Sequence, residues 1–446
     1  MKLSQAAVVT QGVLAGSDMD FRHVSTDTRN IRAGDLFVAL RGENFDAHDF
    51  LEEAARLGAS SALVEKPTTH FSNYIQVADS RRGLGLLASG WADQFAVSRI
   101  AVTGNAGKTT VKEMIACMLG DGVLATRGNL NNDIGVPLTL LSLREEHQFA
   151  VVELGASAAG EIAWTASLLR PQVAMITNVT GAHLEGFGSM QGIADAKAEI
   201  FSAMEAGSVA VINRDDSFAD YFAGIARAKG LMLVFVGADA SNDFSVTNVI
   251  SERDYCSCVL KHQGASYDLS IPLAGTHQVS NALMALAAAT SVGVLLSDAI
   301  QRLQTMRPVK GRMNVQPCLG GTLVDDSYNA NPGSVRAAID WLKHQPGDSA
   351  LVIGRLGELG DSAESIMYEL GEYAARAQIG DVIAMPTAAS VAAGFSDKAV
   401  VADDVAAAAS RAKDILKKGG TVLVKGSRSA RMEAVIEALR AMGETH

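Results

Sequence analysis

One short segment of the sequence places glycine, lysine and hydroxyl side chains where they could bind phosphate. Between a β-branched run at Ser98–Thr103 and a helical spacing of apolar residues, the chain reads Gly104, Asn105, Ala106, Gly107, Lys108, Thr109 and Thr110. In such a segment backbone N–H groups close around phosphate oxygens, the lysine reaches the outer phosphates, and a threonine hydroxyl can bind magnesium. The loop is a shortened form of the general pattern, because Val102 stands at its first glycine position. A nucleotide phosphate site is predicted, with an ordinary glycine turn before a helix as the alternative.

Three further side chains could join this site if the fold brings them near. Glu153 ends the apolar strand predicted at 149–154, and ligands bind at the carboxyl edge of a doubly wound sheet. A carboxylate there suits magnesium, although a strand-end charge facing solvent is the alternative. His183 follows the next strand, and Lys197 lies in a predicted helix. Taken alone, these two would be a surface histidine and a solvated lysine.

Composition limits the classes of protein to which the chain can belong. Its 446 residues carry 38 basic and 49 acidic side chains, and the net charge of -11 would repel a nucleic-acid backbone. The four cysteines are too few and too irregularly spaced for a disulfide framework or a paired zinc site, so a reducing compartment fits. Polar residues interrupt the longest uncharged stretch, 278–297, which favours a buried helix over a membrane span. With no export signal recognised, we expect a cytoplasmic protein without nucleic-acid or membrane partners.

The order of the predicted elements indicates an α/β protein with three domains, at 1–82, 83–308 and 309–446. The first is a small α/β domain with one helix near 50–57. The second is a doubly wound sheet with an antiparallel flank, and the third resembles a dinucleotide-binding fold without the G-x-G-x-x-G signature. Strands are predicted at 24–28, 36–40, 62–65, 98–103, 149–154, 173–179, 209–213, 232–236, 322–325, 350–354, 381–385, 399–401 and 421–425, and the flank at 244–272.

Two longer runs accompany the candidate side chains. The chain reads Ala-His-Leu-Glu-Gly-Phe-Gly at 182–188 and Asp-Asp-Ser-Tyr-Asn-Ala-Asn-Pro at 325–332. Together with the short phosphate loop, Glu153 and Lys197, these runs resemble the motifs of the Mur ligase family. The resemblance extends in order along essentially the whole chain, and it includes the segments at 25–29, 126–132 and 425–429.

Within this family, the sequence most resembles the branch that joins D-alanyl-D-alanine to UDP-N-acetylmuramoyl-tripeptide in peptidoglycan precursor synthesis. It implies one domain for the UDP end of the substrate, a central ATPase domain, and a C-terminal domain that closes over the site. ATP would phosphorylate the tripeptide carboxylate, the dipeptide amine would attack the acyl phosphate, and phosphate would leave. Phosphorylation supplies the leaving group that a bare carboxylate lacks. Small-molecule substrates, ATP, two magnesium ions and a monomeric enzyme are expected.

The resemblance also implies roles for individual residues near the phosphates. Thr109 and Glu153 match ligands of the first magnesium ion, whereas His183 and a carbamoylated Lys197 match ligands of the second. Lys108 would stabilise charge that develops during phosphoryl transfer. Arg312 matches a phosphate contact. The expected catalytic residues are therefore Lys108, His183, Lys197 and Arg312.

The remaining implied roles concern the nucleoside and the second substrate. His277 and Asn281 match adenine contacts, and Asp326 matches the ribose ligand. The residues expected to contact the UDP-muramoyl or dipeptide substrates are Ser25, Thr26, Asp27, Arg29, Gly42, Asp46, His48, Asn131, Asn132, Asn329, Asn331, Lys425, Ser427 and Arg428. Small polar residues of this kind can equally be turn formers.

The sequence departs from the family pattern at one position, and two other classes of ATP-using protein are the alternatives to the predicted function. Arg355 stands where the family usually has an acidic residue, and it would either attract the dipeptide carboxylate or face solvent. A P-loop switch or transport ATPase would not need a uridine-type domain ahead of the loop. Folylpolyglutamate synthetase, a relative with similar amide chemistry, would carry its loop close to the N-terminus.

Overall fold

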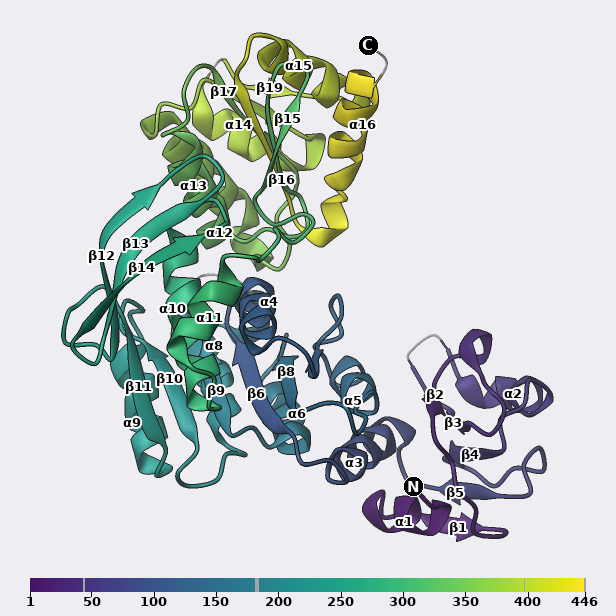
Figure 1. Ribbon diagram of the computed structural model, residues 1–446. Helices are drawn as coiled ribbons and strands as arrows, with labels where there is room; N and C mark the ends of the chain where they lie inside the picture. Colours follow the sequence, from purple (N-terminus) through teal and green to yellow (C-terminus); the bar gives the residue numbers. More distant parts are fainter. Residues whose placement is uncertain (43–44, 181–183, 397, 445–446) are drawn as a thin grey trace.

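Three β-sheets, each flanked by helices, follow one another along the chain (Figure 1). The computed structural model describes residues 1–42, 45–180, 184–396 and 398–444. Within these residues the sheets contain five, nine and six strands, which confirms an α/β fold of three domains. The predicted domain limits stay predictions, and helix α3 (Ser80–Ala92) runs across the first of them.

The first sheet is small and has the strand order β1, β5, β4, β3, β2. Its strands are parallel except β1, which pairs antiparallel with β5 at one edge. The strand predicted at 24–28 ends early, because the Asp27 carboxylate accepts a hydrogen bond from the Arg29 N–H and begins the 3₁₀ helix Thr28–Asn30. The elements are α1 (Leu3–Val9), β1 (Val13–Ala15), β2 (Val24–Ser25), β3 (Leu36–Val38), α2 (Leu51–Arg56), β4 (Ser61–Val64) and β5 (Tyr74–Gln76).

The second sheet has the order β14, β13, β12, β11, β10, β9, β6, β8, β7. It is parallel from β7 to β12, and β12, β13 and β14 then pair antiparallel, as predicted for the flank. Its strands are β6 (Ser98–Thr103), β7 (Val123–Ala125), β8 (Phe149–Glu153), β9 (Val173–Ile176), β10 (Val209–Asn213), β11 (Met232–Gly237), β12 (Phe244–Ser251), β13 (Cys256–His262) and β14 (Ala265–Ile271). Its helices are α4 (Lys108–Leu119), α5 (Gly135–Leu140), α6 (Glu161–Leu169), α7 (Leu184–Phe187), α8 (Met190–Ala198), α9 (Ala219–Ala228), α10 (His277–Ser291) and α11 (Leu296–Leu303).

The place of β6 in this sheet decides which residues meet the phosphate loop. β6 lies between β8 and β9 and is parallel to both. Carboxyl ends of parallel strands meet at one edge of a sheet. Glu153 ends β8, while Thr177 and Asn178 follow β9, so all three lie beside the loop that follows β6.

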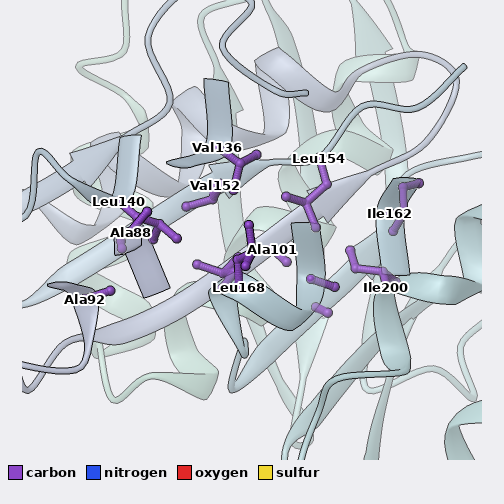
Figure 2. Close-up of a cluster of buried hydrophobic side chains, with 14 of the residues drawn as sticks. Ala88, Ala92, Ala101, Val136, Leu140, Val152, Leu154, Ile162, Leu168 and Ile200 are labelled. Carbon is purple, nitrogen blue, oxygen red and sulfur yellow. The ribbon is translucent and has the colours of Figure 1, made fainter. Parts of the chain in front are cut away.

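Two apolar layers cover the faces of the central sheet. On one face, α3, α5 and α6 pack against the strands, and Figure 2 shows Leu140 and Leu168 from two of these helices in the shared core. On the other face lie α4 and α10, and α10 is buried continuously from 281 to 289. The long uncharged stretch therefore forms a buried helix up to residue 291, as predicted for most of its length.

The third sheet has the order β15, β16, β20, β17, β18, β19 and is parallel except for the β15–β16 pair. Its strands are β15 (Asn314–Cys318), β16 (Gly321–Asp326), β17 (Ser349–Ile353), β18 (Asp381–Ala384), β19 (Val400–Val401) and β20 (Thr421–Lys425). Its helices are α12 (Pro332–Leu342), α13 (Ala363–Arg376), α14 (Ala389–Phe395), α15 (Val405–Lys417) and α16 (Glu433–Glu444).

Two predictions from composition concern the whole chain. The cysteines are all free, and Cys256 and Cys258 are buried on one strand, β13, where they pack as small apolar side chains. Among the described helices, none combines the length and the apolar character that crossing a membrane requires.

The packing of α5 against the sheet gives a test of the core. Leu140 is 0% exposed, so Leu140→Ala should lower the free energy of unfolding by about 2–5 kcal/mol through lost apolar contact and a residual cavity. Urea unfolding of the two proteins measures this loss. Leu295→Ala is the matched control, because Leu295 is 68% exposed, and its effect should stay within about 0.5 kcal/mol. Equal effects of the two substitutions would contradict the assigned packing.

Candidate active site

The loop after β6 requires glycine at two positions. Gly104 has φ +140°, and a Cβ there would lie 2.0 Å from Thr177 Oγ1. Gly107 has φ +79° and begins α4, and a Cβ there would lie 2.7 Å from Asn281 Oδ1. Both conformations are ones that other residues rarely adopt. The loop therefore lies directly against the end of β9 and the first turns of α10.

The residues that follow β9 hold this loop in place. Thr177 Oγ1 donates a hydrogen bond to the Ala106 carbonyl at 2.6 Å, and the Ala106 N–H donates to Asn178 Oδ1 at 3.0 Å. The Asn105 N–H donates to the Asn178 carbonyl at 3.1 Å. Thr177 and Asn178 were not among the predicted site residues. Their position directly after the strand that neighbours β6 is the signal that could have found them.

Lys108 lies over the loop from the first turn of α4. Its Nζ donates a hydrogen bond to the Gly104 carbonyl at 2.8 Å. Burial lowers the pKa of the Lys108 ammonium, the Glu153 carboxylate opposes that shift, and the Arg312 guanidinium adds to it. The Glu358 carboxylate also opposes this lowering of the pKa, so Lys108 lies within reach of one further cation and two carboxylates.

Glu153 is 3% exposed, so it is not a strand-end charge in solvent. Its Oε2 accepts a hydrogen bond from Thr109 Oγ1 at 2.8 Å, and its Oε1 accepts one from Asn131 Nδ2 at 2.8 Å. A carboxylate and a hydroxyl thus lie together at the edge of the phosphate loop. Oxygen ligands of this kind are the ones that magnesium prefers.

Arg312 reaches this pair from the third domain. Its Nη2 donates to Thr109 Oγ1 at 3.3 Å, and its guanidinium lies 4.5 Å from the centre of the Tyr328 ring. The Arg428 guanidinium also lies near that ring, at 5.6 Å. Tyr328 therefore packs against both cations. Its role was not predicted, although it lies within the 325–332 run that carried the family resemblance.

Asp326 and Lys425 form a buried ion pair on neighbouring strands. Lys425 Nζ lies 2.5 Å from Asp326 Oδ2 and donates to the Asn329 carbonyl at 3.2 Å. Burial lowers the pKa of Lys425, and the Asp326 carboxylate opposes this shift. Asp326 Oδ1 also accepts from the Met313 N–H at 3.2 Å. The pair therefore braces the segment that follows Arg312.

The start of α10 supplies the next wall of the site. Asn281 Nδ2 donates to Gln278 Oε1 at 2.9 Å, and the Gln278 amide lies 3.1 Å from the His277 Nε2 atom. Burial lowers the pKa of the His277 imidazole, and the Asp326 carboxylate opposes that shift. A neutral imidazole at this position has one N–H donor and one acceptor nitrogen.

Asn331 joins the third domain to the phosphate loop. Its Oδ1 accepts from the Ser334 N–H at 2.8 Å and so caps α12, while its Nδ2 donates to the Asn105 carbonyl at 3.1 Å. Gly333 lies close by, because a Cβ there would be 3.0 Å from Thr180. The Nδ2 and Oδ1 atoms of this amide thus each have a partner within the protein.

These groups enclose one cavity of about 450 Å³ between the second and third sheets. Its volume lies in the range of small-molecule sites. The predicted site residues that line it are Asn105, Ala106, Gly107, Lys108, Thr109, Thr110, Asn131, Glu153, His277, Asn281, Arg312, Asp326, Asn329, Asn331, Lys425 and Arg428. Predicted residues outside this lining are Gly104, Lys197, Asn132, Ser427 and those of the first domain. His183 lies outside the residues that the structure describes.

Lys197 is buried, not solvated. It lies on α8 with 1% of its surface exposed, and its Nζ is 5.6 Å from the centre of the Phe187 ring. Burial, together with the charge of Lys108, lowers the pKa of Lys197 to about 7. The amine is therefore much easier to deprotonate than an ordinary lysine.

The predicted residues of the first domain form two local turns. Asp27 pairs with Arg29 at 2.6 Å, and the Ser25 hydroxyl donates to the Asp27 carbonyl at 2.8 Å. In the second turn, Asp46 Oδ1 lies 2.6 Å from His48 Nδ1, and the His48 Nε2 atom accepts from the Glu65 N–H. These residues thus shape turns, and their contact with a substrate stays a prediction, as it does for Thr26 and Gly42.

Two further residues singled out in the sequence, Asn132 and Arg355, do not line the cavity. Asn132 Oδ1 accepts from the Gly135 N–H at 2.9 Å and so begins α5. Arg355 is exposed, and its carbonyl accepts from the Ser427 N–H at 2.9 Å. Within the described residues there is no cluster of three or more histidine, cysteine or carboxylate side chains that could hold a metal ion by itself.

Comparison with known families matches three regions of the chain in order. Residues 20–91 match the model described as "Mur ligase family, catalytic domain", and residues 102–289 match "Mur ligase middle domain". Residues 311–428 match "Mur ligase, glutamate ligase domain". The three matches correspond to the three sheets.

Individual proteins resemble the chain over nearly its whole length. The UDP-N-acetylmuramoyl-tripeptide--D-alanyl-D-alanine ligase of Escherichia coli (strain K12) is 41% identical over 99% of this chain and 98% of its own. A crystal structure of MurF from Acinetobacter baumannii has a TM-score of 0.92 at 35% identity and covers 98% of both chains. MurF ligase from Thermotoga maritima in complex with ADP has a TM-score of 0.85 at 29% identity, covering 95% of this chain and 98% of its own. With a shared fold, three matching domain models and such coverage, this chain belongs to the Mur ligase family.

Proposed function

We propose that this protein is an ATP-dependent ligase that joins D-alanyl-D-alanine to UDP-N-acetylmuramoyl-tripeptide. The observation that carries the proposal is the cavity in which the phosphate loop, Glu153 and Arg312 come together from two domains. The full-length relative from Escherichia coli, at 41% identity, supports the choice of substrates. A monomeric enzyme that works in the cytoplasm, on small-molecule substrates, is part of the same proposal.

The residues of the cavity fit ATP and a magnesium ion. Loop N–H groups and Lys108 would hold the phosphates, and Thr109 with Glu153, whose oxygens lie 2.8 Å apart, would bind the first metal ion. A second ion would take His183 and a carbamate on Lys197. When bound, the ions would neutralise phosphate charge. His277, Asn281 and Asp326 would contact the nucleoside.

Within this site the chain's own groups do three things. Lys108 bonds to the phosphate loop of the second domain, and Arg312 reaches Thr109 from the third, so the two cations can stabilise negative charge on a phosphoryl group held at the loop. Residues of the third domain form part of the cavity lining and would limit access of water to an acyl phosphate. The dipeptide side would be formed by Asn329, Asn331, Lys425, Ser427 and Arg428. The turns at 25–29 and 42–48 would hold the uridine end, and Asn131 and Asn132 would lie near the sugar and peptide.

One assay tests the proposed reaction. ADP release is measured over a matrix of UDP-muramoyl peptides and candidate amines. We expect release only when a UDP-muramoyl-tripeptide and D-alanyl-D-alanine are both present. ADP formation that needs neither substrate, or that responds to a protein partner, would favour a switch ATPase.

Lys108→Ala should reduce turnover by at least about 100-fold, because the ammonium serves phosphate charge and makes its hydrogen bond to the loop, not to the core. The initial rate of ADP release measures this, with circular dichroism to check the fold. Lys417→Ala, at the exposed end of α15, is the matched control and should keep the normal rate. Near-normal turnover in Lys108→Ala would remove the lysine from the mechanism.

Glu153→Gln should raise the magnesium concentration needed for half-maximal rate by about tenfold or more, since an amide keeps the shape but not the charge that a hard cation needs. A magnesium titration at saturating ATP gives this value. Glu372→Gln, on the exposed face of α13, controls for loss of one negative charge. If both variants titrate alike, Glu153 does not bind the ion.

Lys197→Arg should be nearly inactive, because a guanidinium keeps the positive charge but cannot form a carbamate. Lys197→Ala should regain part of its rate with small carboxylic acids that supply the missing oxygens. Labelling with ¹³C-bicarbonate gives an independent measurement, and a carbamate signal is expected in the natural protein but not in Lys197→Arg. Full activity of Lys197→Arg, or no such signal in the natural protein, would rule out the modification.

A further inference from the structure

A buried lysine without a part in this mechanism lies one turn beyond Lys108 in α4. Lys112 is 1% exposed, and it is among the largest fully buried side chains of the described residues. Burying an ammonium group costs free energy unless hydrogen bonds replace its water. The partners of Lys112 therefore indicate what its burial achieves.

Lys112 Nζ has two hydrogen-bond partners, the Glu113 carboxylate and the Thr126 carbonyl, the latter at 2.7 Å. Glu113 is the next residue along the chain, and its side chain is more than a third exposed, so water can solvate it. The Thr126 carbonyl is fourteen residues away and buried. The bond to Thr126 joins the helix of the phosphate loop to the segment that follows β7.

That segment provides the hydrogen bonds that hold Glu153. The Thr126 hydroxyl accepts from the Glu153 N–H at 3.0 Å, and Asn131 Nδ2 donates to the Glu153 carboxylate at 2.8 Å. The Asn131 carbonyl also accepts from the Gly155 N–H at 2.8 Å. Glu153 is thus held on its backbone and on its carboxylate by a segment whose first residue bonds to Lys112.

We infer that Lys112 is a positioning residue, which holds the Thr126–Asn131 segment so that the Glu153 carboxylate stays aimed at the metal site. The inference rests on the proposed role of Glu153 in magnesium binding. It also predicts the direction in which metal affinity changes when Lys112 is replaced. Removing a nearby cation would, by charge alone, strengthen binding of a divalent ion. Loss of positioning weakens it instead, and partners of metal ligands typically contribute 10- to 100-fold to metal affinity.

The test measures binding of Mn²⁺ to the full chain in the presence of ADP, by the electron paramagnetic resonance signal of free Mn²⁺, so that no turnover is needed. Lys112→Met keeps the length of the side chain but loses the donor, and we expect about tenfold weaker binding or more. Lys112→Arg can still donate to the Thr126 carbonyl and should recover part of the affinity. Glu113→Gln removes only the exposed partner and should bind Mn²⁺ like the natural protein.

Affinity in Lys112→Met equal to or above that of the natural protein would overturn the inference, as would an equal loss in Glu113→Gln. If Lys112→Met does not fold, Thr126→Val decides, because it removes the hydroxyl that holds the Glu153 N–H; unchanged Mn²⁺ affinity in that variant overturns the inference. If the natural protein forms no ligation product, the proposed function is wrong, whatever the Mn²⁺ affinities of the variants. A natural protein that ligates normally, with Lys112→Met unaffected, refutes the positioning role alone.

Discussion

The cavity is organised around the Glu153 carboxylate, because its two oxygens accept hydrogen bonds from different segments. Thr109 comes from the helix of the phosphate loop and Asn131 from the segment after β7, and Arg312 reaches Thr109 from the third domain. A buried carboxylate needs such partners, and here they also bring the phosphate loop, a candidate metal ligand and the Arg312 cation to one point. The order β8, β6, β9 makes this meeting possible, since it sets the three strand ends side by side.

Much of this architecture could be predicted because its elements leave strong local signals. Strands buried on both faces, such as β6 and β10, contain short continuous apolar runs, at 100–102 and 209–212, and their predicted bounds agree with the structure. Strands β1, β5, β7 and β15 were not predicted. They are short or lie at sheet edges, and β15 includes Pro317, so pairing with a neighbour and not an apolar pattern defines them.

The site residues, too, could be predicted from the sequence only in part. Residue type and spacing were enough to propose Lys108 and Glu153, because glycines, a lysine and a strand-end carboxylate have few other uses in that order. The partners that hold them were not evident. Thr177 and Asn178 act through the neighbouring strand, and the burial of Lys197 depends on how α8 packs. Such roles depend on which segments become neighbours in the folded chain, and the sequence alone does not show this.

The contact between Gly107 and Asn281 has a consequence for how the sequence can change over evolution. A methyl group at 107 would overlap the Asn281 amide, and the left-handed backbone at 107 would strain any L side chain even if residue 281 became smaller. A smaller residue at 281 would remove the overlap but not the backbone strain. Position 107 is therefore restricted to glycine whatever residue stands at 281, more than 170 residues away in the sequence.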